Sequence, residues 1–92
     1  MELSKEQMDM LAKLAARFFN VRQCAIVLQV SVTELKREMK NENSEVFKTY
    51  YGAQLKAELD LRDGIFALAV RGSSPAQAQM LKISEQTSSA NG

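Results

Sequence analysis

One stretch of this 92-residue sequence constrains its fold more than any other. Residues 45–71 contain no proline and consist mostly of strong helix formers, which predicts a single long helix. At 1.5 Å per residue this helix measures about 40 Å, whereas a compact chain of this size has a radius of gyration of only about 12 Å. We therefore expect that one copy of the chain cannot bury the whole helix, and that the working unit is an assembly of copies.

Capping motifs predict three shorter helices ahead of the long one. In such a motif a Ser or Asn side chain and a Gln or Glu three residues later satisfy each other's backbone amides. The predicted helices end near residues 19–20, 28 and 40. The three motifs pair Ser4 with Gln7, Asn20 with Gln23, and Ser31 with Glu34.

A fifth helix is expected after the long one. Gly72 is placed as a helix terminator, and Ser74 is the expected cap of the next helix, with Pro75 in its first turn. No strand-like alternation of useful length occurs, so the predicted fold is all-α. We expect a helix-turn-helix cluster over residues 1–43, an antiparallel helical hairpin for oligomerisation over residues 44–86, and a disordered tail over residues 87–92.

The second and third short helices have the pattern of a helix-turn-helix pair. Small Ala25 lets the two helices approach closely, and Leu28, Val30 and Leu35 are expected to fill the wedge between them. Cys24 is expected to face the same core as a small buried hydrophobe. The pattern resembles the helix-turn-helix signature of DNA-binding proteins, except that Gln29 stands where glycine is usual and would carry a modest strain penalty.

In a helix-turn-helix the second helix enters the major groove and presents its outward residues to base edges. Arg37 can fork onto guanine, Ser31 and Thr33 can donate hydrogen bonds, and the lysines suit phosphates. Residues 17–40 carry five basic and two acidic side chains, a net charge of +3, which is a weak electrostatic footprint. The predicted DNA-binding residues are Arg22, Ser31, Thr33, Lys36, Arg37 and Lys40.

Placing the long helix at 100° per residue separates two apolar stripes. The first stripe contains Tyr51, Leu55, Leu59, Phe66 and Val70, and the second contains Val46, Tyr50, Ala57, Leu61 and Leu68. We expect the final helix to cover one stripe, and the N-terminal cluster or another subunit to cover the other. The predicted oligomerisation residues are Tyr50, Tyr51, Leu55, Leu59, Leu61, Phe66, Leu68 and Val70.

The composition argues against catalysis and metal binding. The chain has no histidine and a single cysteine, which removes imidazole bases, Cys–His pairs and Cys/His zinc clusters. No Gly-rich phosphate loop is present, so no nucleotide or other cofactor is expected. The longest apolar run, residues 65–70, is far shorter than the ~20 residues that span a bilayer. One cysteine cannot form an internal disulfide, so we expect a reducing, cytoplasmic location.

The order of these elements is similar to that of the small terminase subunit of tailed bacteriophages. The resemblance covers residues 20–86 and implies a non-enzymatic, ring-forming protein that recognises double-stranded viral DNA. It also implies that the protein modulates a large terminase subunit, which carries the ATPase and nuclease, in the host bacterial cytoplasm. The matching residues are Val30, Ser31, Thr33 and Leu35, then Glu45-Val46-Phe47, Tyr51-Gly52-Ala53, Leu59, Phe66, Ala69 and Gly72, and finally Ser74-Pro75-Ala76 and Met80-Leu81-Lys82.

Two other functions fit the same residues. A small transcription regulator could use the same helix-turn-helix, and as a dimer it would read paired half-sites. A helical protein-interaction module with no DNA role is the alternative from a different class. The size of the native particle separates packaging from regulation, and the effect of Lys36 and Arg37 on DNA retention separates both from the interaction module.

Overall fold

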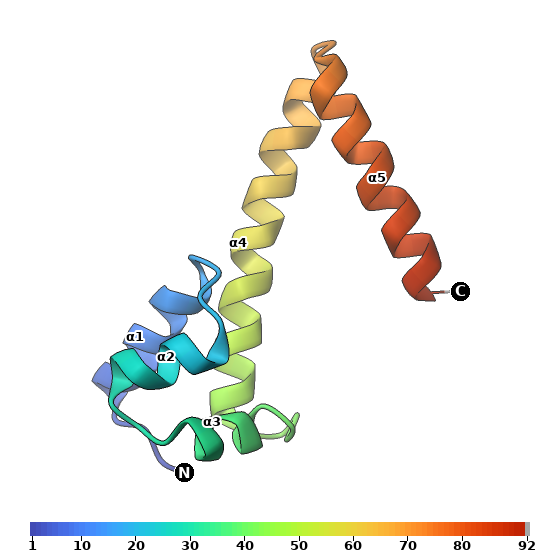
Figure 1. Ribbon diagram of the computed structural model, residues 1–92. Helices are drawn as coiled ribbons and strands as arrows, with labels where there is room; N and C mark the ends of the chain where they lie inside the picture. Colours follow the sequence, from blue (N-terminus) through green and yellow to red (C-terminus); the bar gives the residue numbers. More distant parts are fainter. Residues whose placement is uncertain (92) are drawn as a thin grey trace. The chain divides into compact units, whose positions relative to one another are not determined.

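A computed structural model describes residues 1–91, and it confirms the all-α fold (Figure 1). Within this range the chain contains helices and no strands. The five helices are α1 (Lys5–Ala15), α2 (Val21–Leu28), α3 (Val32–Glu38), α4 (Glu45–Val70) and α5 (Ser74–Asn91). The described contacts divide the chain into two compact units, Met1–Glu58 and Leu59–Gly92.

Two of the three predicted capping motifs form completely. Ser4 and Gln7 close a reciprocal pair of bonds at the start of α1, and Asn20 and Gln23 do the same at the start of α2. At α3 only half of the motif is present: the amide of Glu34 donates to Ser31 Oγ at 3.2 Å, but the amide of Ser31 does not donate to the Glu34 carboxylate in return. Local sequence therefore fixes where all three helices begin.

α1 ends earlier than its apolar periodicity predicts. The expected end was near residues 19–20, but the helix stops at Ala15, and Phe18 takes a left-handed conformation with φ 65°. The amides of Phe18 and Phe19 donate to the carbonyls of Ala15 and Leu14, which is the Schellman arrangement of a helix end. The reason lies in the next helix: Asn20 must be extended to cap α2, so α1 has to close before it.

The core of the N-terminal unit draws on its first four helices. α1 packs on α2, and α2 packs on α3. The start of α4 joins this core, so the predicted boundary at residues 43–44 falls inside the unit and the observed division falls within α4. The buried residues are Leu11, Leu14, Ala15, Cys24, Ala25, Leu28, Leu35, Val46 and Tyr50.

Tyr50 ties α4 to the end of α1. Its side chain is only 3% exposed, and its hydroxyl donates to the backbone oxygen of Phe19 at 2.7 Å. Burial raises the pKa of Tyr50 above its ordinary value of 10.0, with smaller contributions from Cys24 and Tyr51. Burial also raises the pKa of the Cys24 thiol above its ordinary value of 9.0. The expectation that Cys24 is a small buried residue of the core is confirmed.

In the second unit, α5 and residues 59–70 meet at a tight turn (Figure 1). Gly72 has φ 100°, which confirms its role as terminator of α4. The expected cap of α5 is displaced by one residue: Ser73, not Ser74, accepts from the amide of Ala76 at its Oγ, at 3.4 Å. The Gln77 side chain donates to the Ala69 carbonyl at 3.0 Å, which fastens the first turn of α5 to α4.

The structure extends α5 beyond the predicted start of the tail. Residues 87–92 were expected to be disordered, but the helix continues to Asn91, and Gly92 lies outside the described residues. The Thr87 hydroxyl donates to the carbonyl of Ile83 at 2.9 Å, so this polar segment satisfies its groups within the helix. Across residues 1–91, no helix is both long and apolar enough to cross a membrane.

Candidate nucleic-acid interface

A three-residue turn joins α2 to α3. Gln29 follows α2 in the left-handed region, with φ 60° and ψ 42°. The amide of Val30 donates to the Ala25 carbonyl at 3.0 Å, and Ser31 then caps α3. This is the same helix-end geometry as at Phe18, and it confirms the expectation that Gln29 occupies a strained turn position.

Buried side chains hold the two helices in place. Ala25 and Leu35 are fully buried between them, and Leu28 is nearly so. α1 adds a polar tie, because the Gln7 side chain donates to the Leu28 carbonyl at 3.4 Å. Because these contacts join α1, α2 and α3, the position of α3 in the N-terminal unit is fixed by packing and not by the turn alone.

The burial of Leu35 defines which side of α3 faces solvent. At 100° per residue, Thr33, Arg37 and Lys40 lie within about 40° of the direction opposite Leu35, and Lys36 lies beside them. We call these four residues the outward face of α3; all four are exposed. Thr33, Lys36 and Arg37 belong to α3 itself, and Lys40 lies in the turn that follows it.

The other two predicted DNA-binding residues stand apart from the outward face. Ser31 is exposed, but its oxygen already accepts from the backbone of α3, which leaves its hydroxyl hydrogen for an external partner. Arg22 is exposed on α2. Within residues 1–91, no salt bridge involves Arg22, Lys36, Arg37 or Lys40, so their charges are available to a polyanion. Glu38 instead pairs with the Met1 ammonium group at 3.2 Å.

The predicted oligomerisation residues divide into two groups. Tyr50 was included among them wrongly, because it is buried in the core of its own unit. Tyr51 is half-buried and packs between Phe47 and Tyr50, with ring centroids 4.7 and 5.0 Å away. The remaining residues are exposed by 52–73% of their surface; they are Leu55, Leu59, Leu61, Phe66, Leu68 and Val70.

α5 does not cover either stripe as predicted. In the second unit it is fastened to Ala69, and Ala69 and Ile65 are half-buried. On the helical wheel Ile65 lies between the stripes and Ala69 lies at the edge of the first stripe, in line with Tyr51. Phe66 on the first stripe and Leu68 on the second remain exposed. Within the second unit, both stripes of α4 therefore present unpartnered apolar surface.

The structure shows two features that the sequence pattern did not predict. The positive φ of Phe18 was not predicted, because the apolar spacing of the preceding helix continues through this residue. The capping residue Asn20, two residues later, was the sequence signal that the helix has to end before it. The carboxylate of Glu34 was expected to complete a capping motif, but it has no hydrogen bond or salt bridge within the described chain. No sequence signal distinguished Glu34 from Gln7 and Gln23, which do complete theirs.

The strain at Gln29 gives a test of the turn. Gln29→Gly is expected to raise the free energy of unfolding of the N-terminal unit by about 0.5–1 kcal/mol, because glycine adopts φ 60° without the penalty of a Cβ. Urea unfolding followed by tyrosine fluorescence measures this, since both tyrosines lie in that unit and the chain has no tryptophan. The control Gln23→Gly should destabilise instead, because Gln23 is helical and closes a capping motif.

No protein-family model matches the chain, and neither curated proteins nor solved structures give a match. The residues of the chain itself are therefore the basis of the function proposed below.

Proposed function

We propose that this chain is the non-enzymatic DNA-recognition subunit of an oligomeric assembly of the small terminase kind. In this proposal it binds double-stranded viral DNA and modulates a large terminase subunit in the cytoplasm of a bacterial host. The observation that carries the DNA-binding part is the outward face of α3. It combines three cations and a hydroxyl, all exposed and free of salt bridges, on a helix held by a buried core.

Each residue of the interface has a defined task in this proposal. α3 enters the major groove with its outward face toward the base edges. Arg37 donates two hydrogen bonds to guanine O6 and N7, and the Thr33 hydroxyl bonds a neighbouring base or phosphate. Lys36 and Lys40 contact phosphates, and Arg22 reaches the backbone from α2.

Several copies are needed for useful affinity. Residues 17–40 carry a net charge of only +3, so a single copy makes few phosphate contacts and binds weakly at physiological salt. Linked copies raise the effective concentration at the DNA without any new contact. The two exposed stripes of α4 supply the surface for such an assembly, because each leaves large apolar side chains in water.

The test is duplex DNA binding by a Lys36→Ala/Arg37→Ala double variant. We expect its affinity at about 0.1 M salt to fall tenfold or more, with a shallower dependence on salt, because two cationic contacts are lost. The matched control is Lys5→Ala/Lys13→Ala, which removes the same charge from exposed positions of α1. Fluorescence anisotropy on a labelled duplex over a salt series measures both quantities.

Equal losses in the two double variants would mean that binding follows net charge and not the outward face. Binding that is insensitive to both salt and Lys36/Arg37 would instead favour a helical interaction module. A native mass corresponding to a dimer would favour the transcription regulator, because paired half-sites match two-fold symmetry. A closed ring supports the packaging role.

A further inference from the structure

The carboxylate of Glu34 takes part in no hydrogen bond or salt bridge of the described fold. Glu34 occupies the third position of α3, the same position that Gln7 holds in α1 and Gln23 holds in α2. Those two side chains accept a bond from the backbone of their caps at 2.9 and 3.0 Å. Glu34 is exposed, and within residues 1–91 its carboxylate neither accepts a hydrogen bond nor pairs with a cation.

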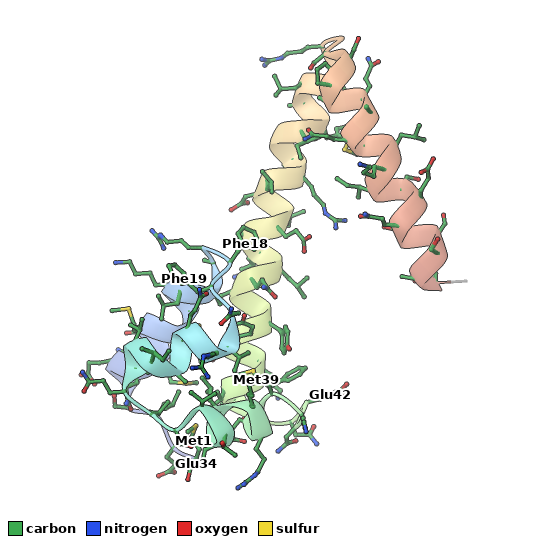
Figure 2. All side chains as sticks on the ribbon, viewed as in Figure 1. Met1, Phe18, Phe19, Glu34, Met39 and Glu42 are labelled. Carbon is green, nitrogen blue, oxygen red and sulfur yellow. The ribbon has the colours of Figure 1, made fainter. Side chains whose placement is uncertain are left out.

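The position of Glu34 places this carboxylate at the edge of the proposed DNA interface. Glu34 and Arg37 are one helical turn apart, and both line a small hollow beside Met1. Figure 2 shows Glu34 next to Met1. On the helical wheel Glu34 flanks the outward face on the side opposite Lys36. It also lies in the first turn of α3, the part of a recognition helix that approaches the bases.

A carboxylate in that position has a narrow range of partners in DNA. It can only accept hydrogen bonds, so it is repelled by phosphates and by the acceptor atoms of guanine and thymine. Adenine offers an N6 amino group, but the acceptor N7 beside it repels a carboxylate. Cytosine offers its N4 amino group in the major groove, and Glu or Asp accepting from it is a recurrent contact. Arg37 nearby has the opposite preference, because its guanidinium only donates and suits guanine.

We propose that Glu34 is a specificity-determining residue that selects cytosine at the base facing the first turn of α3. The inference rests on the DNA-binding function proposed above. The chain then recognises a duplex site in which this cytosine lies close to a guanine contacted by Arg37. The same negative charge weakens binding to all other sequences. It therefore lowers the affinity for DNA in general and raises the selectivity for sites with this cytosine.

The experiment selects binding sites from a random duplex pool with the full chain, Glu34→Gln and the control Glu6→Gln. Glu6 is an exposed acid in the first turn of α1, so this control removes the same charge from the first turn of another helix. We expect the wild type and the control to enrich one cytosine position. Glu34→Gln should shift that position to adenine, the usual partner of glutamine. Its affinity for an unrelated duplex should rise about fivefold, the value of one close charge repulsion in water.

Three outcomes overturn the inference, and they separate it from the proposed function. Identical sites from Glu34→Gln and wild type would remove Glu34 from recognition. If the wild type and both variants bind DNA but enrich no sequence, the proposed selectivity is refuted and the DNA-binding function is not. Failure of the wild type to bind any duplex would refute the proposed function and the inference with it.

Discussion

Leu35→Ala is expected to lower the free energy of unfolding of the N-terminal unit by about 3 kcal/mol. Leu35 is fully buried, and it is the only residue of α3 in the described core. Replacing a buried leucine with alanine costs about 2–5 kcal/mol, because apolar contacts are lost and a cavity remains. The total stability of a small domain is only about 5–15 kcal/mol, so this one change removes a large part of it.

The measurement is urea unfolding followed by tyrosine fluorescence, as for the Gln29 variant. Ile26→Ala is the matched control: Ile26 is also a large aliphatic residue of this unit, but it is 59% exposed on α2. Its replacement should cost less than about 0.5 kcal/mol. If the two variants lose the same stability, α3 is not anchored through Leu35. α3 would then lack the support on which the proposed interface depends.

Leu59→Gln/Phe66→Gln is expected to convert an oligomer into smaller particles. The first stripe places these two residues within about 20° of each other on α4, and both are more than half exposed. Burying them against another copy stabilises an interface, and losing about 3 kcal/mol of that burial weakens association roughly 100-fold. Because glutamine favours helices and both positions are exposed, the fold of the single chain should not change.

Native mass spectrometry over a micromolar concentration series measures this effect. The wild type should appear at a multiple of the 10.3 kDa chain mass, and the double variant should dissociate at much higher concentrations. The control Ala67→Gln places the same side chain on an exposed position about 100° away from Phe66. A wild type that stays monomeric at micromolar concentration would contradict the proposed assembly, as would a double variant with unchanged mass.

Several parts of the fold could be predicted because their causes are local. The starts of α1, α2 and α3 follow from side chains that bond to backbone amides three residues away. The end of α4 follows from Gly72, whose missing Cβ permits a positive φ. The exposure of the residues proposed to bind DNA from α3 was also predictable, since charged and polar side chains opposite a buried leucine face solvent.

Other parts could not be predicted because they depend on residues far apart in the sequence. The periodicity of residues 45–71 placed Tyr50 and Leu61 on one stripe, but only packing showed that Tyr50 is buried and Leu61 exposed. The hydroxyl of Tyr50 finds its acceptor at Phe19, 31 residues earlier. The position of α5 was not predicted either, because it depends on contacts with α4: the Gln77 side chain donates to the Ala69 carbonyl, and Ala76 of the apolar face of α5 is buried.

The sequence by itself determined that this chain is helical, where most of its helices begin, and which surface of α3 carries cations. Short-range hydrogen bonds and helical periodicity suffice for those features, because each acts within one or two turns. Only the tertiary structure decided that α4 starts inside the N-terminal core, that both apolar stripes stay open beyond it, and that Glu34 stays unbonded. Those features depend on which side chains and backbone groups contact one another in the folded chain, and the spacing of residues along the sequence does not specify those contacts.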